Sequence, residues 1–139
     1  MTPTRPHTTG SPGYSETWRS EAETARRARG LVRAALNTWN LNGDLLDRAQ
    51  LVVSELVTNS ITHSGCKLLR VSVTRYSHYG VRITVTDKSK KQPEPRRPAL
   101  DDTSGRGLLL VQTMADDWGV TERSFGKSVY ADLLVEDPD

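Results

Sequence analysis

The sequence contains a single cysteine and lacks any long apolar run. Cys66 alone excludes both an internal disulfide and a multi-cysteine zinc site. No apolar run approaches the ~18 residues that a membrane-spanning helix needs, so we expect no membrane segment. Residues 1–13 lack the apolar core of a secretion signal, and we therefore expect a cytoplasmic protein.

The formal charge is nearly balanced over the whole chain but uneven along it. With 35% hydrophobic and 26% charged residues in a length of 139, the composition is typical of one soluble globular domain. The net charge of +2 argues against a general nucleic-acid binder, so we expect no direct contact with nucleic acid. Residues 66–106 carry ten basic and four acidic residues. That segment either meets an anionic partner or forms an unevenly charged solvated surface.

The hydrophobic pattern predicts an α+β fold, a two-layer α/β sandwich. Residues 1–14, rich in Pro, Thr, Ser and Gly, predict a disordered tail, and residues 15–137 form a single domain. Helical periodicity and strand alternation then define the remaining elements. In order, these are an extended piece (14–18) and two helices (20–39 and 44–63), followed by a hairpin (69–73 and 81–85, turn at 77–80). A loop (88–103), a helix that starts after residues 104–105 and ends near 114, and a hairpin (118–122 and 127–135, turn at 124–126) complete the chain.

The helix predicted over residues 44–63 is apolar around much of its circumference and also carries a polar stripe. Glu55, Asn59 and His63 recur at intervals of four and so align along the helix. A carboxylate and an amide inside a buried helix cost several kcal/mol unless something satisfies them. The amide oxygen suits Mg²⁺, and the carboxylate can deprotonate a nucleophile. The alternative, at even odds from the spacing, is that the stripe faces solvent.

Two further features lie downstream of this helix. Asp87 continues the core-facing parity of Val81, Ile83 and Val85, where a carboxylate can accept a hydrogen bond from an exocyclic amine such as that of adenine. Taken alone, Asp87 fits a strand-ending cap at least as well. The glycines in residues 104–111 (SGRGLLLV) permit close approach of a phosphate to a helix N-terminus, although a simple turn also explains them.

Together, in this order, these features resemble the GHKL ATP-binding superfamily, which includes gyrase, heat-shock chaperones, histidine kinases and mismatch-repair ATPases. Within it the chain is similar to the short bacterial anti-sigma factor serine/threonine kinases. Residues 51–60 (LVVSELVTNS) look like their N box, and residues 105–111 (GRGLLLV) look like their second glycine box. Residues 118–119 (WG) and 126–130 (GKSVY) match the closing hairpin, so the resemblance covers about residues 22–135.

The resemblance implies a Bergerat-type ATP-binding fold, with a mostly antiparallel mixed sheet and helices on one face. It also implies ATP and Mg²⁺ as cofactors, with Asn59 holding the metal against the nucleotide phosphates and Glu55 acting as general base. Asp87 would read the adenine amine. His63 either joins the nucleotide site or satisfies the helix end. The residues that would support the phosphates are Ser104, Gly105, Arg106, Gly107 and Leu108.

One departure from the family pattern follows Asp87. The superfamily has Asp-x-Gly-x-Gly at its first glycine box, whereas residues 87–91 here read DKSKK. Loss of those glycines would weaken adenine binding or reshape the loop. Lys88 and the lysines after it would then either attract phosphate or contact an acidic protein partner.

The function implied by the resemblance is that of an anti-sigma factor-like regulator. Such a chain would be an ATP-dependent serine/threonine protein kinase that phosphorylates an anti-sigma factor antagonist and sequesters a sigma factor. Its partners would be a sigma factor, an antagonist protein or both, and homodimerisation is open. The alternative is a non-catalytic binding module with a degenerate nucleotide site, which the missing glycines favour and the intact Glu55–Asn59 pair opposes. A histidine-kinase-like fragment is disfavoured, since no dimerisation helix with a phospho-acceptor histidine lies upstream.

Overall fold

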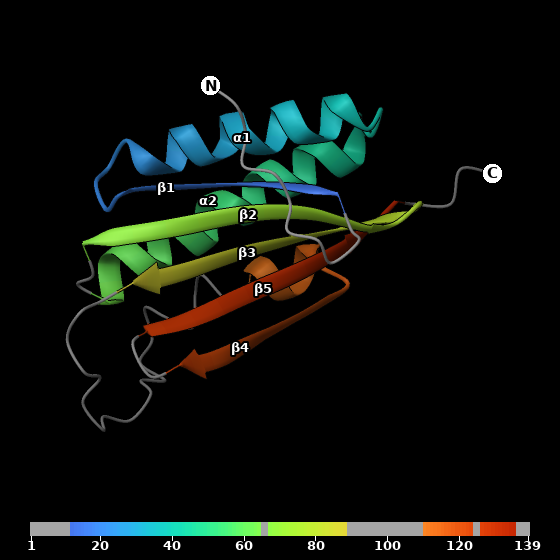
Figure 1. Cartoon of the computed structure of the whole chain (residues 1–139). Coiled ribbons are helices and arrows are strands. Elements are labelled where there is room, and N and C mark those ends of the chain that lie inside the picture. Colours follow the sequence, from blue (N-terminus) through green and yellow to red (C-terminus); the bar gives the residue numbers. More distant parts are fainter. Residues whose placement is uncertain (1–11, 65–66, 89–109, 124–125, 136–139) are drawn as a thin grey trace.

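The computed structural model describes residues 12–64, 67–88, 110–123 and 126–135, which fold into two layers (Figure 1). One layer is a sheet and the other consists of helices. Residues 110–114 are helical and form the described part of a third helix. The labelled elements are β1 (Gly13–Arg19), α1 (Thr24–Thr38), α2 (Asp44–Ser64), β2 (Leu68–Ser77), β3 (Gly80–Lys88), β4 (Asp117–Arg123) and β5 (Gly126–Leu134).

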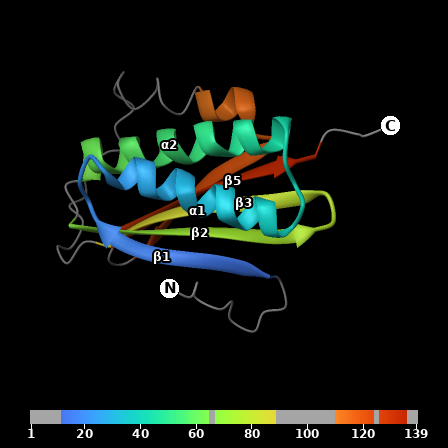
Figure 2. The same cartoon turned by 90° about the horizontal axis from the view of Figure 1, so that it is seen from above.

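The sheet has the order β1-β2-β3-β5-β4, and every pairing among its described strands is antiparallel. The predicted α+β class is therefore confirmed, but the described sheet is antiparallel rather than mixed. The helices cover one face, with α1 against β1 and β2 and with α2 against β3 and β5. Figure 2 shows α2 lying between α1 and the helix of residues 110–114.

The core forms where alternate strand residues meet the inner sides of the helices. The apolar strand residues predicted to face the core, Val81, Ile83 and Val85, are at most 1% exposed, because their alternation turns every second side chain toward the helices. The helices contribute apolar residues at spacings of three and four. The buried apolar residues of the two main helices are Ala28, Val32, Ala35 and Leu36 in α1, and Leu45, Ala49, Val52, Val53, Leu56 and Val57 in α2.

The start of α1 was predicted too early. Helix α1 begins at Thr24 rather than at Ser20. The Ser20 N–H donates to the Lys67 carbonyl (2.9 Å), and the Thr24 hydroxyl donates to the Arg19 carbonyl (2.5 Å). These two hydrogen bonds keep the backbone after β1 beside the start of β2, so it cannot enter the helix until residue 24.

The other predicted elements divide between the described residues and the rest of the chain. The extended piece near residues 14–18, the helix over 44–63 and both hairpins are confirmed as β1, α2 and the pairs β2–β3 and β4–β5. The tail up to residue 11, the loop from residue 89 and the first part of the third helix lie outside the described residues. Within the described ranges, no helix is long and apolar enough to cross a membrane.

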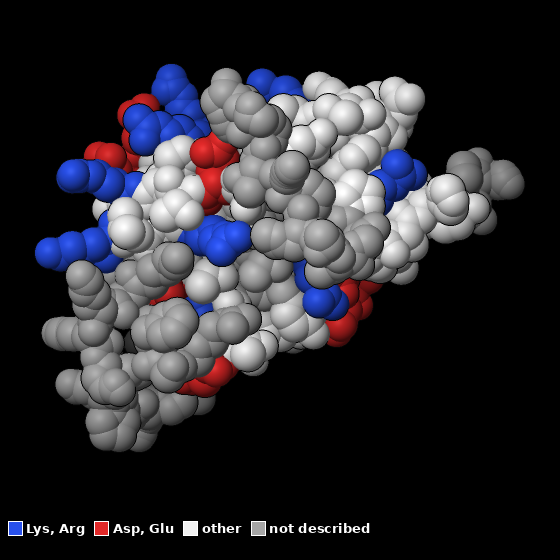
Figure 3. Space-filling view, viewed as in Figure 1, with Lys and Arg blue, Asp and Glu red and all other residues white. Residues whose placement is uncertain are grey.

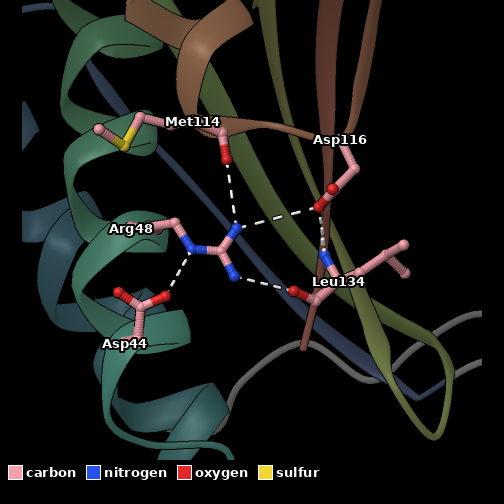
Figure 4. Close-up of polar contacts among 5 residues, drawn as sticks. All are labelled: Asp44, Arg48, Met114, Asp116 and Leu134. Atoms are coloured by element: carbon pink, nitrogen blue, oxygen red, sulfur yellow. Dashed lines mark hydrogen bonds and ion pairs between the residues drawn. The ribbon is translucent and has the colours of Figure 1, made fainter. Parts of the chain in front are cut away.

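One arginine joins three elements at the N-terminal end of α2 (Figure 4). Arg48 donates from Nε to Asp44 Oδ2 (2.9 Å), from Nη1 to the Met114 carbonyl (3.2 Å) and from Nη2 to the Leu134 carbonyl (2.8 Å). Asp116 Oδ2 lies 3.9 Å from Nη1 and accepts the Leu134 N–H (2.8 Å). The Arg48 side chain is only 17% exposed, so these bonds are shielded from water. They fasten α2 to the end of the third helix and to the end of β5.

We expect Arg48→Met to lower the free energy of unfolding by about 1–3 kcal/mol, since two carbonyls and a carboxylate lose a charged donor. Urea unfolding measures this directly. The matched control is Arg26→Met, whose side chain is 68% exposed and pairs only with Glu23 at 3.6 Å. That change should stay within about 0.5 kcal/mol of wild type. Equal effects of the two substitutions would contradict the anchoring role of Arg48.

Candidate functional site

The orientation of α2 about its own axis is fixed on three sides. Its buried apolar residues lie on the sheet. On the flank toward α1, the Ser54 hydroxyl accepts a hydrogen bond from Arg29 Nη1 (2.9 Å), and Gln50 Nε2 donates to the Arg29 carbonyl (3.2 Å). On the opposite flank, Arg48 contacts the end of the third helix. The flank of α2 that faces away from α1 is therefore the one beside the third helix.

Glu55 and Asn59 lie on that same flank. Seven residues make about two helical turns, so Glu55 follows Arg48 along the helix surface, and Asn59 comes one turn later. Both side chains are half-buried, at the margin of the buried stripe formed by Leu56, Val57 and their neighbours. The expectation of a polar pair sealed inside an apolar helix is thus met only in part. Both side chains therefore retain some exposure to solvent. His63 belongs to α2, but its side chain is outside the described set.

The C-terminal half of α2, the end of β3 and the start of β5 lie at one end of the molecule (Figure 1). β2 begins four residues after α2 ends, and its second residue, Leu69, lies opposite Asp87 of β3. The next strand continues this edge, because Thr86 lies opposite Ser128 of β5. The topology therefore gathers the predicted acid, amide and adenine-reading aspartate at a common end of the fold.

Asp87 occupies the position that its parity predicts. Asp87 is 4% exposed and lies on the face of the sheet that the helices cover. Gly126 of β5 passes directly against it. A Cβ built on Gly126 would overlap the Asp87 carbonyl oxygen and would lie 2.9 Å from Asp87 Oδ1. Because glycine has no side chain, β5 can approach the backbone and the carboxylate of Asp87 this closely at Gly126.

Sequence reasoning missed the two residues of β5 nearest to Asp87. Both Gly126 and Lys127 belong to the sequence that matches the closing hairpin (126–130), but that match gives neither residue a role at the site. The alternation of side chains along the strand could have identified the face on which Lys127 lies. Lys127 continues the row of Val129, Ala131 and Leu133, which faces the helices. Lys127 is half-buried and lies opposite Glu122 of β4, which places one cation on the Asp87 face of this edge.

Several predicted site residues cannot be placed. Lys88 is the last residue of β3, and its side chain is outside the described set. Residues 104–109, which include most of the second glycine box, also lie outside the described set. Their predicted roles toward phosphate therefore remain predictions. The residues concerned are Ser104, Gly105, Arg106, Gly107 and Leu108.

Two arginines in the described part of the basic segment are occupied by contacts within the chain. Arg82 forms a bidentate pair with Asp132 (2.7 and 3.0 Å), which raises the pKa of the guanidinium, and its Cζ lies 4.2 Å from the centre of the Tyr130 ring. Arg75 donates to the carbonyls of Ser77 and His78 (3.2 Å each). Figure 3 shows basic and acidic side chains intermixed over the start of α1 and the end of β1. Of the two alternatives for this segment, the anionic partner gains no support from Arg75 and Arg82.

The residues present fit a magnesium ion only as one bound jointly with phosphate. Among the described residues, no three His, Cys, Asp or Glu side chains gather as a metal site. Mg²⁺ in nucleotide sites commonly uses one or two protein oxygens plus phosphate oxygens and water. The half-buried Asn59 amide on its accessible flank matches that requirement, with Glu55 one turn away.

Comparisons with known proteins agree with this fold. The model of the histidine kinase-like ATPase domain family matches residues 18–132. A Streptomyces coelicolor protein, SCO4941, is 33% identical over 96 residues, and the match covers 62% of this chain and 85% of that protein. A crystal structure of the RsbU and RsbW domains of Rv1364c from Mycobacterium tuberculosis matches with a TM-score of 0.66 at 17% identity, over 91% of this chain. The chain spans 33% of that longer chain, so this likeness concerns the fold. With the family model matching most of its length, the chain belongs to the histidine kinase-like ATPase domain family.

Proposed function

We propose that the chain binds ATP with Mg²⁺ and acts as an anti-sigma factor-like serine/threonine protein kinase. The observation that carries this proposal is the position of Glu55 and Asn59. They share the flank of α2 that faces away from α1, at the same end of the fold as the buried Asp87. The proposed protein substrate is an anti-sigma factor antagonist, and the proposed sequestered partner is a sigma factor. The likeness to a chain containing an RsbW domain supports the fold in which such an activity would operate.

Each residue has a distinct task in this proposal. The Asp87 carboxylate accepts a hydrogen bond from the exocyclic amine of adenine, and its burial excludes competing water. Asn59 supplies an amide oxygen to the metal, which when bound would neutralise phosphate charge. Glu55, one turn away, takes the proton of the attacking serine hydroxyl. Ser104 to Leu108 would hold the phosphates through backbone N–H groups at a helix start.

A second candidate is a binding module that sequesters its partner without phosphotransfer. It is favoured by the sequence DKSKK at residues 87–91, which lacks the glycines usual after the adenine-reading aspartate. Such a binding module would still bind ATP if Asn59 holds the metal and Asp87 accepts from adenine as proposed for the kinase. Phosphotransfer separates the two candidates.

We expect Asn59→Ala to abolish magnesium-dependent ATP binding without unfolding the chain, because the amide oxygen is the proposed metal ligand. Isothermal titration with ATP, with and without Mg²⁺, measures the effect, and circular dichroism checks the fold. Thr58→Ala is the matched control, since Thr58 is the adjacent exposed residue of α2. Equal affinity in wild type and Asn59→Ala would exclude the metal-ligand role.

Glu55→Gln should keep ATP affinity and lose phosphotransfer. A general base acts on the chemical step, where its loss typically costs ~10²–10⁴-fold in rate. The assay follows transfer of radiolabelled phosphate to a purified antagonist protein. Asp47→Asn, an exposed carboxylate in the first turn of α2, serves as the charge-matched control. If the variant transfers phosphate at the wild-type rate, Glu55 is not the base. If wild type transfers none to any antagonist, the binding module is the better account.

Gly126→Ala should weaken ATP binding and reduce the preference for ATP over GTP, because the added Cβ would push β5 away from Asp87. Gly30→Ala in α1 is the matched control. A Cβ there meets nothing within 4 Å, and a helical Gly→Ala change stabilises by about 1 kcal/mol. Competition binding with both nucleotides tests the pair. An unchanged ATP/GTP ratio in Gly126→Ala would show that β5 does not shape the base pocket.

A further inference from the structure

Lys127 places a cation beside the buried carboxylate of Asp87, and the proposed function gives this lysine no task. Strands β3 and β5 pair in antiparallel register as far as Thr86 opposite Ser128. The residues that follow this pair are Asp87 on β3 and Lys127 on β5. Because side chains alternate along each strand, both lie on the face of the sheet that the helices cover.

The two strands remain side by side beyond the pair of Thr86 and Ser128. A Cβ added to Gly126 would lie 2.9 Å from Asp87 Oδ1, and Lys127 is the residue of β5 between Gly126 and Ser128. Residues opposite each other in an antiparallel pair have Cβ atoms about 4.5–5.5 Å apart. The flexible four-carbon stem of a lysine can span such a distance. A ligand that contacts the Asp87 carboxylate therefore also lies within reach of the Lys127 ammonium.

The surroundings of Lys127 leave its ammonium available to a ligand. The residue is half-buried, and among the described residues none forms a hydrogen bond or an ion pair with the ammonium. Glu122 lies opposite it on β4 but is exposed to solvent. Partial burial removes part of the hydration of a charged group, and an acceptor on a ligand would replace the lost hydrogen bonds.

We propose that Lys127 is a second base-reading residue of the nucleotide site, whose ammonium donates a hydrogen bond to N1 of adenine. This inference rests on the proposed binding of ATP, in which Asp87 accepts from the exocyclic amine. That amine and the N1 acceptor are neighbours on the adenine ring, so a carboxylate beside an ammonium matches both. Guanine has a carbonyl oxygen in place of the amine and an N–H group at N1. The carboxylate would then meet an acceptor and the ammonium a donor, which disfavours guanine.

The test combines wild type and Lys127→Met with ATP and 1-deaza-ATP, in which a C–H group replaces N1. Calorimetric titration of the full chain in the presence of Mg²⁺ measures the four affinities. Wild type should bind ATP about tenfold or more tightly than 1-deaza-ATP, because the analogue loses a hydrogen bond from a charged donor. Lys127→Met keeps an apolar stem and lacks the donor. This variant should bind ATP more weakly than wild type does and should bind the two nucleotides with nearly equal affinity.

Lys67→Met is the matched control, because Lys67 is an exposed lysine just before β2, and it should keep the wild-type preference for ATP. Equal affinity of wild type for ATP and 1-deaza-ATP would overturn the inference without any substitution. Equal weakening of both nucleotides in Lys127→Met would also overturn it, since the lysine would then act on the phosphates. Both results leave the proposed function standing, whereas a wild-type chain that binds neither nucleotide would overturn the proposed function together with this inference. Circular dichroism checks the fold of each variant.

Discussion

The fold depends on how helix α2 is held against its neighbours, and Arg48 provides the polar part of that attachment. Its guanidinium bonds the carbonyls of Met114 and Leu134 and the carboxylate of Asp44. These groups come from the third helix, β5 and α2 itself, so a single side chain joins segments up to 86 residues apart in the sequence. Because Arg48 is mostly buried, its bonds favour one rotation of α2, the rotation that also buries the apolar stripe.

The position of the proposed nucleotide site follows from that rotation. With Ser54 turned toward α1 and Arg48 toward the described end of the third helix, Glu55 and Asn59 must lie on the flank of α2 that faces away from α1. The antiparallel sheet brings Asp87 to the same end by a separate route, through the pairing of Leu69 with Asp87. Two independent constraints, the rotation of a helix and the pairing of two strands, thus bring Glu55, Asn59 and Asp87 to the same end of the folded molecule.

Much of this could be predicted from the sequence, for reasons that differ between residues. The alternation of Val81, Ile83 and Val85 predicted the face on which Asp87 lies, because strand parity leaves two choices and the apolar residues select one. The start of α1 could not be predicted, since the bond from Ser20 to Lys67 joins positions that only the folded sheet brings together. The role of Gly126 could not be predicted for the same reason, because its close approach to Asp87 depends on the pairing of β3 with β5. The sequence did not indicate the role of Arg48, because two of its acceptors are backbone carbonyls, which every residue has.

The central claim is that this end of the fold binds magnesium-bound ATP. Calorimetric titration of the wild-type chain with ATP tests it most directly, in buffer containing Mg²⁺, in buffer containing EDTA, and with GTP in place of ATP. The account predicts saturable one-site binding with ATP and Mg²⁺, strong weakening in EDTA because Asn59 needs the metal, and weak binding of GTP because Asp87 accepts from the adenine amine. Absence of saturable ATP binding, or affinity that is the same with and without Mg²⁺, would contradict it.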